Sequence, residues 1–545
     1  MKNQKSSLLL LTLLALSGSA QALADEAEEL RSLRDTTIAL VNALVQQGVL
    51  TREKADELIR KAEQAGKSGA VVAAAPPTPP AGAGAAAAGA AAGSAAVPPP
   101  GVIRVPYISE TVKQQITDEV KQEVVEQAKE ERWGSPGVLP TWLDRIAFRG
   151  DVRVRAQADR FPSGNPPNGT PEQFAQPQFG AYNIDNTTEP NNRLRLRVRF
   201  GFEAKVADTV TADVRLTSGP INDPSTENET LGNYNERGQV AFDLAFLTYR
   251  PVPWAYIMAG RLGNPFISPT TLVWGDDLSL QGIVGGLTPH FTRELQGFFT
   301  AGAFPIEQIN PSPYTEAKTK WMWGYQAGYN WRISPQISWM LAGALYDYRH
   351  AEGIPDPTQF STVYNLTAAP FRQKGNSVFD IAYLANAANG TQNYVIGLAS
   401  KFNELNFSTA LDLATLRGKN VVLSGDWVKN LGYDQQEIYN RTGQYVPEQT
   451  RGYQVRIAYG DLTFERKYAW QAFLGYRYVQ SDAVVDAFTD ADFHLGGTNA
   501  TGYYFGARYA FATNSTIGIR YFTAKQIDSL PLSIDVLQID WIAAF

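Results

Sequence analysis

The chain has 545 residues, 11% of them aromatic, no cysteine and a formal net charge of −6 at pH 7. The lack of cysteine excludes disulfides, thiolate metal sites, cysteine nucleophiles and the lipidated cysteine of a bacterial lipoprotein. The nearly balanced charge gives no reason to expect nucleic acid as a partner.

The first 24 residues have the pattern of a secretory signal peptide. A basic start is followed by the apolar run Leu8–Leu16 and by two small-residue cleavage patterns, of which we favour cleavage after Ala24. No later run of ~18 or more apolar residues occurs, so a membrane crossing by the mature chain would have to use strands.

Residues 25–66 have a helical pattern, with Gly48 as a C-cap and Thr51 as the N-cap of a second helix. They predict a helical hairpin, which either serves as a simple fold element or binds a specific partner. Residues 67–105 are almost entirely Ala, Gly and Pro. This composition predicts a linker, which would reach about 120 Å if fully extended.

Residues 106–135 predict another helix, with Ser109 as its N-cap. Its apolar residues recur every four positions from Val112 to Val124 and form a narrow seam. Such a seam suits a small contact, for example between copies in an oligomer, and a coiled coil is one option.

From residue 143 onward the pattern changes to alternation. In the stretch 193–206 every second residue is apolar, and the residues between include Arg193, Arg195, Arg197 and Arg199. A period of two places these sets on opposite faces of a strand. A row of unpaired guanidinium groups is costly to bury, so this face must meet water while the other meets lipid. The pattern is typical of a transmembrane β-barrel, and a soluble β-sandwich explains it poorly.

The rhythm of long loops and tight turns predicts an all-β antiparallel barrel of about sixteen strands over residues 143–545. The segment 394–413 is taken as one strand; splitting it at Asn403 would give eighteen. The final strand ends on Phe545, and a terminal aromatic residue resembles the signal that barrel-assembly machinery recognises. The predicted strands are 146–159, 193–206, 209–217, 239–249, 254–262, 281–288, 294–304, 319–331, 337–349, 394–413, 419–430, 451–461, 467–480, 501–512, 516–525 and 533–545.

The inward face of this barrel is rich in arginine, which favours anions in a pore. Alternatively, the arginines neutralise carboxylates of the loops and only stiffen the wall. The connection after residue 262 carries Asp276 and Asp277 and either folds into the lumen opposite the arginines or lies on the outer rim. The predicted pore-lining residues are Arg149, Arg153, Arg155, Arg193, Arg195, Arg197, Arg199, Arg261, Asp276, Asp277, Arg456, Arg477, Arg508 and Arg520.

Enzymatic chemistry has little support in this sequence. The three histidines are His290, His350 and His494, and only the last has nearby acids, in Asp490–His494. The spacing of that cluster matches no metal-binding loop, and it is interpreted as a polar extracellular loop. We therefore expect no catalytic residue, no metal site and no cofactor.

Several blocks of sequence resemble a family of Gram-negative outer-membrane porins. The resemblance covers about residues 104–545 and implies a porin barrel, diffusion of small hydrophilic solutes and a homotrimer. The block Val273–Leu278 is similar to the constriction pattern of the family, with Gln281 where an acid is expected. The blocks are 106–116, 131–146, 425–430, 486–499 and 532–541.

The sequence thus predicts an anion-leaning outer-membrane porin whose N-terminal extension lies in the periplasm. Its expected partners are outer-membrane lipid, barrel-assembly machinery acting on the Phe545 strand, further copies of the chain, and a periplasmic or cell-wall partner of the helices. Two alternatives remain: a substrate-specific channel for small anions, and a structural tether between the outer membrane and the cell wall.

Overall fold

A computed structural model describes residues 145–168, 186–358, 361–385, 392–415, 418–528 and 531–545. The expected signal peptide, helical hairpin, linker and residues 106–135 lie outside these ranges. None of the described helices is both long and apolar enough to cross a lipid bilayer.

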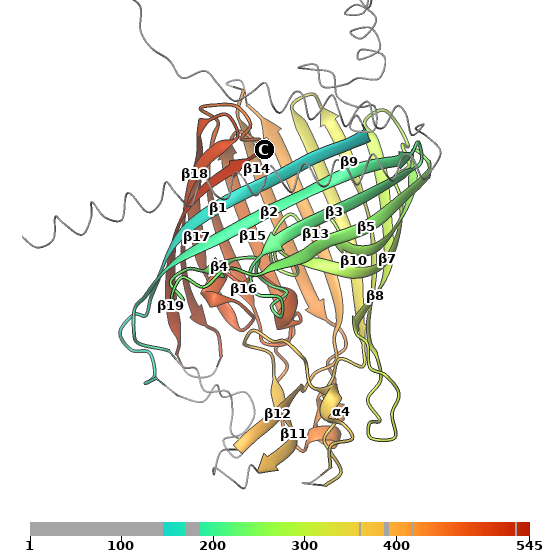
Figure 1. Cartoon of the computed structure of the whole chain (residues 1–545), viewed down its shortest axis with the longest axis vertical. Helices are drawn as coiled ribbons and strands as arrows, with labels where there is room; N and C mark the ends of the chain where they lie inside the picture. The colour runs from blue at the N-terminus through green and yellow to red at the C-terminus, as the bar shows by residue number, and fades with distance from the viewer. Residues whose placement is uncertain (1–144, 169–185, 359–360, 386–391, 416–417, 529–530) are drawn as a thin grey trace, which may run out of the picture. The chain divides into compact units, whose positions relative to one another are not determined.

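Among the described residues, sixteen long strands close into one antiparallel barrel (Figure 1), as the alternation predicted. Closure occurs where β1 pairs with both β2 and β19. The two-residue β4 (Glu229–Thr230) adds to β2. The barrel strands are β1 (Ile146–Arg160), β2 (Asn191–Ala207), β3 (Val210–Ser218), β5 (Val240–Val252), β6 (Ala255–Gly263), β7 (Ser279–Leu287), β8 (Leu295–Glu307), β9 (Lys320–Ser334), β10 (Ile337–Arg349), β13 (Asn403–Ala414), β14 (Asn420–Asn430), β15 (Arg451–Gly460), β16 (Trp470–Val479), β17 (Ala500–Ala512), β18 (Ser515–Gln526) and β19 (Ser533–Ala544).

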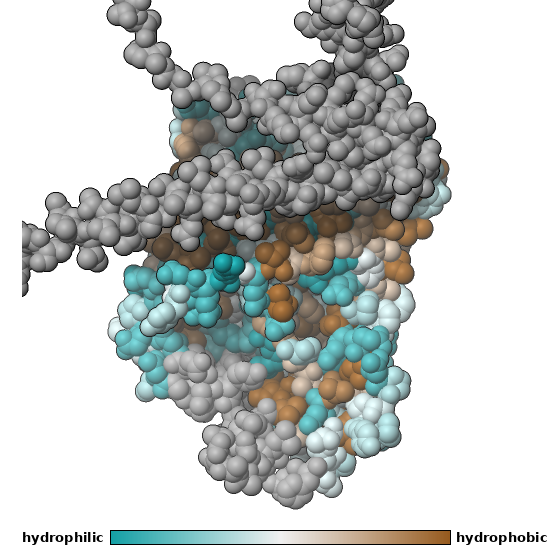
Figure 2. All heavy atoms as spheres, viewed as in Figure 1, coloured by the Kyte–Doolittle hydropathy of each residue, from teal (hydrophilic) through white to brown (hydrophobic). Residues whose placement is uncertain are grey.

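The alternation of the sequence becomes the two faces of the wall. On β2, Leu194, Val198 and Phe200 are exposed, whereas Arg197 between them is 7% exposed. Apolar side chains are exposed in the same way on strands around the barrel, including Ile283 and Ile457. Figure 2 shows hydrophobic residues gathered on the wall, with hydrophilic residues more frequent toward the end that carries β11 and β12. An apolar exterior on this many strands fits a wall surrounded by hydrocarbon.

The last residue completes the barrel closure. Gly150 and Phe545 exchange two backbone hydrogen bonds, of 2.8 and 2.9 Å. A Cβ atom at Gly150 would lie 2.6 Å from the Phe545 ring, so only glycine leaves room for this ring. The C-terminal aromatic residue is therefore packed against the first strand.

One predicted strand was wrong. The segment 394–413 divides into β12 (Gln392–Leu398) and β13 (Asn403–Ala414), and β12 pairs with β11 (Val378–Ala385) in a separate two-stranded sheet. This hairpin and helix α4 (Gln435–Thr442) project from one end of the barrel (Figure 1) and share an apolar cluster that includes Phe379 and Ile438. Strand alternation continues through the break, so the sequence does not reveal the change of pairing partner.

Candidate functional site in the barrel lumen

The connection between β6 and β7 folds into the lumen against one side of the wall. Its Phe266, Leu272 and Trp274 are almost fully buried in a cluster with Phe304 and Tyr346 of the wall. The Trp274 ring stacks on Phe266 at 6.2 Å and meets Tyr346 edge-on at 4.9 Å. The inward face of β8–β10 is apolar here, and burying it under the loop is favourable.

Polar contacts carry the same loop across the lumen. The Thr270 backbone N–H and hydroxyl both donate to Asp426 on β14, at 3.0 and 2.6 Å. The Ile267 backbone N–H donates to Gln326 on β9 at 2.8 Å. The loop thus contacts β9, two strands beyond β7 in the barrel order, and β14, five strands beyond it.

The two adjacent aspartates of this loop have different roles. Asp277 accepts a hydrogen bond from Arg197 at 2.9 Å and lies 3.6 Å from Arg153. Burial alone would raise the pKa of Asp277, but the guanidinium groups of Arg153 and Arg197 outweigh it and hold the pKa below the usual range.

Asp276 is exposed to the lumen and forms no hydrogen bond or ion pair with another described residue. The protein around Asp276 reduces the hydration of its charged form, which raises the pKa of Asp276 to about 6. The nearby carboxylates of Asp490 and Asp277 raise this pKa further. Of the two aspartates, Asp276 is therefore the one whose carboxylate stays accessible in the lumen.

A second connection, between β16 and β17, also folds into the lumen. Asp492 accepts hydrogen bonds from Arg155 at 3.0 Å, Arg520 at 2.9 Å and Gln538 at 2.9 Å. Burial opposes ionisation of Asp492, yet Arg155 and Arg520 hold its pKa well below the usual value. The segment Asp490–His494, interpreted from the sequence as a polar extracellular loop, is part of this connection, and two of its aspartates contact arginines of the wall.

The single histidine of the Asp490–His494 segment is buried in the folded protein. His494 is 1% exposed, and its Nε2 lies 3.2 Å from the Leu532 carbonyl oxygen. Burial, followed by Lys374, lowers the pKa of His494 to about 3, so the ring is neutral at physiological pH. Asp490 pairs with Arg477 at 3.4 Å. Within the described ranges, no three His, Asp or Glu side chains group as metal ligands would.

Most of the predicted pore arginines are paired with carboxylates. Arg149 is a special case, since its side chain is 59% exposed near the tight-turn end, away from the infolded loops. The sequence pointed to Asp277 opposite the arginines and to neutralisation by loop carboxylates, but it does not show which acid pairs with which arginine, because most partners are remote in the chain. The pairs are Arg149 with Asp213 and Glu203, Arg153 with Asp277, Arg155 with Asp492 and Asp540, Arg193 with Asp159, Arg197 with Asp151, Asp277 and Glu227, Arg199 with Asp151 and Glu227, Arg477 with Asp490, and Arg520 with Asp492 and Asp540.

Four of the predicted arginines have no carboxylate within 4 Å in the described part of the chain: Arg195, Arg261, Arg456 and Arg508. Arg456 donates to Gln471 at 3.0 Å and lies 4.6 Å from the centre of the Phe473 ring. Arg508 donates to Thr516 at 3.0 Å and lies 4.4 Å from the Phe464 ring. Stacking on aromatic rings fixes both guanidinium groups without neutralising them.

These groups surround a cavity of about 310 Å³ inside the barrel. Asp276 and Thr271 line it from the β6–β7 loop, and Asp490 lines it from the β16–β17 loop. Facing them from the wall are Arg456, Arg477, Arg508 and Arg520. The cavity therefore has an exposed carboxylate on one side and arginines on the other, an arrangement that produces an electric field across the lumen.

Residues 34–545 match the family model described as "Putative porin". The chain belongs to this porin family. Porins are water-filled outer-membrane channels for passive diffusion, and the sixteen-stranded barrel agrees with that class. A search of curated protein sequences found no match.

Solved structures with a similar chain trace include three outer-membrane proteins. The channel DcaP of Acinetobacter baumannii is 10% identical (TM-score 0.39, covering 73% of this chain and 97% of that one). OprB of Pseudomonas putida is 11% identical (TM-score 0.42, 74% and 95%). OmpF of Salmonella typhi is 10% identical (TM-score 0.37, 73% and 97%). Similarity of this degree does not identify a solute.

Proposed function

We propose that the protein is an outer-membrane porin in which the 310 Å³ cavity between Asp276 and the arginines of β15–β18 is the constriction. Solutes would pass between the two infolded loops and this part of the wall. The single observation that carries the proposal is the exposed Asp276 facing the carboxylate-free Arg456 and Arg508 across one water-accessible space. A transverse field of this kind orients dipolar solutes and disfavours apolar ones.

An anion preference follows from the charges that remain after pairing. The positive charges of Arg477 and Arg520 are largely cancelled by the carboxylates of Asp490 and Asp492. The uncompensated charges that line the cavity are then the two positive charges of Arg456 and Arg508 and the negative charge of Asp276. The excess of one positive charge at the constriction favours small anions. The paired arginines support the other interpretation of the sequence, since they hold the loops in place and contribute little net charge.

A channel specific for small anions is the second candidate function. Two infolded loops narrow the lumen, and a narrow passage with fixed charges can distinguish solutes by shape as well as by charge. We further propose a homotrimer in the outer membrane, an N-terminal extension in the periplasm, and recognition of the Phe545 strand by barrel-assembly machinery. A tether function of residues 25–105 stays a separate hypothesis.

Planar-bilayer recording tests the proposal. The purified full-length protein is expected to give stable conductance steps in KCl, and the reversal potential across a salt gradient should indicate chloride preference. A cation preference would refute the anion assignment, and absence of conductance in a correctly folded barrel would refute the porin proposal. Deletion of residues 25–105 should leave conductance unchanged, and loss of envelope attachment in that variant would support the tether.

A further inference from the structure

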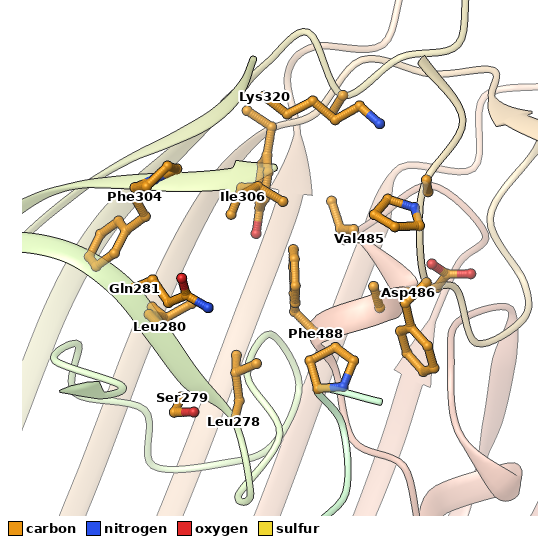
Figure 3. A pocket seen from close by; sticks show the side chains of 18 of the residues that line it. Leu278, Ser279, Leu280, Gln281, Phe304, Ile306, Lys320, Val485, Asp486 and Phe488 are labelled. Atoms are coloured by element: carbon orange, nitrogen blue, oxygen red, sulfur yellow. The ribbon is translucent and has the colours of Figure 1, made fainter. Parts of the chain in front are cut away.

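A second cavity, of about 180 Å³, lies against the wall formed by β7–β10 (Figure 3). Its lining is mainly apolar and comes from the wall and from two loops. Leu280 and Phe304 belong to the wall, Phe371 to the β10–β11 connection, and Val485 and Phe488 to the β16–β17 loop. In Figure 3, Phe488 faces Phe304 and Gln281 across the space. Three phenylalanine rings thus surround it, which suits a flat apolar group.

One end of this cavity carries groups that can bind an anion. Arg261 on β6 and Gln281 on β7 are direct register partners, so their side chains lie beside each other, and both line the cavity. The Nε of Arg261 donates to the Asp243 carbonyl oxygen at 2.9 Å, and its two Nη atoms have no partner among the described residues. A guanidinium with two free nitrogens is shaped to hold a carboxylate.

Gln281 and Ser279 add neutral hydrogen-bonding capacity beside Arg261. The Gln281 side chain is exposed to the cavity, and Figure 3 shows its amide directed into the space. The Ser279 hydroxyl is buried and has no hydrogen-bond partner in the described ranges. A buried hydroxyl without a partner is costly, and a ligand carboxylate at this end would supply one.

The other charged groups around the cavity limit the ligand to a single negative charge. The Lys320 ammonium is already occupied, because it donates to Glu307 at 2.7 Å and to the Ala368 carbonyl oxygen. Asp486 lines the cavity from the loop opposite Gln281. A second carboxylate on the ligand would therefore meet a carboxylate instead of a cation.

The volume agrees with one aromatic ring. A cavity of about 150 Å³ lined by Leu, Ile and Phe is large enough to bind benzene. The space here is about 180 Å³, which leaves room for a carboxylate on the ring. An acid without a ring would leave the three phenylalanines uncovered.

We propose that this cavity is a binding site for aromatic monocarboxylates of the size of benzoate. The carboxylate contacts Arg261, Gln281 and Ser279, and the ring lies among Phe304, Phe371 and Phe488. The proposal rests on the porin function proposed above and names a solute class for it. The site is distinct from the 310 Å³ constriction, with which it shares no lining residue.

Single-channel recording with added benzoate tests the site. Benzoate should interrupt the chloride current in a concentration-dependent manner, whereas equal concentrations of acetate, which lacks the ring, and benzyl alcohol, which lacks the charge, should not. Arg261→Gln and Gln281→Glu should each raise the half-blocking benzoate concentration about tenfold or more. The matched control is Gln336→Glu, the same change at an exposed residue in the β9–β10 turn, and it should behave as the wild type.

The outcomes separate this proposal from the porin function. Normal conductance in KCl without any interruption by benzoate would overturn the binding site and leave the porin function intact. Equal interruption by acetate or by benzyl alcohol would also overturn it, because recognition would then need only the charge or only the ring. Absence of conductance in the folded protein would instead refute the porin function. Variants that keep the wild-type KCl conductance are folded, so a change in their benzoate response reports binding.

Discussion

Removing the two carboxylate-free arginines should reverse the ion preference of the channel. In the double variant Arg456→Gln/Arg508→Gln, the cavity keeps Asp276 and loses both uncompensated positive charges. The local charge left after pairing changes from one positive to one negative. Glutamine preserves most of the side-chain length, so the aromatic contacts with Phe473 and Phe464 are the main packing loss.

The size of the effect follows from the cavity dimensions. A volume of about 310 Å³ corresponds to a sphere of about 4 Å radius, so an ion at its centre lies about 5 to 6 Å from a lining charge. At this distance the Coulomb energy between the ion and one lining charge is about 0.7 kcal/mol in water, and screening by 0.1 M salt reduces it to about 0.4 kcal/mol. Removing one arginine makes the cavity less favourable for chloride and more favourable for potassium, each by this energy. The chloride-to-potassium permeability ratio should therefore fall about fourfold for one arginine and about fifteenfold for both.

The assay is the reversal potential across a KCl gradient centred on 0.1 M. Arg293→Gln is the matched control, because Arg293 is exposed in the β7–β8 turn and does not line the cavity. An unchanged reversal potential in the double variant, with normal conductance, would show that ions pass elsewhere and would refute the assignment of the constriction.

Three further predictions concern the loops. Because the pKa of Asp276 is raised to about 6, acidification from pH 7 to 5 should neutralise its carboxylate and increase the chloride preference of the channel. In Asp276→Asn the chloride preference should change little with pH. A chloride preference of the wild type that falls on acidification would contradict this prediction. Asp492→Asn removes the buried carboxylate that Arg155 and Arg520 contact and should lower the free energy of unfolding by about 3 kcal/mol. Thermal denaturation in detergent measures this change, and wild-type stability would contradict the prediction. Trp274→Ala should remove about 3 to 5 kcal/mol of packing free energy that holds the β6–β7 loop against the wall, and the released loop should raise the single-channel conductance. An unchanged conductance would mean that the polar contacts suffice to hold the loop.

The local pattern of the sequence contained most of the barrel. Alternation such as that of residues 193–206 depends only on the two-residue strand period, and the tight turns set the order of the strands. The sixteen strands of the barrel could therefore be predicted. The period says nothing about the partner of a strand, which is why β12 was assigned to the barrel although it pairs with β11.

The candidate site was less accessible from the sequence. Asp276 and Asp277 were recognised as a pair, but only the fold separates them into an exposed carboxylate and one held by Arg197 and Arg153. The infolding of the β16–β17 loop gave no sequence signal, because Asp492 and Arg155 are 337 positions apart.

Residue periodicity alone decided that this chain forms a barrel with an apolar exterior and an arginine-rich interior, since facing lipid or water is a property of each side chain on its strand. Which arginines remain uncompensated was decided only by the tertiary structure. Charge compensation depends on distances between residues remote in the chain, and these distances exist only once the loops have folded into the lumen.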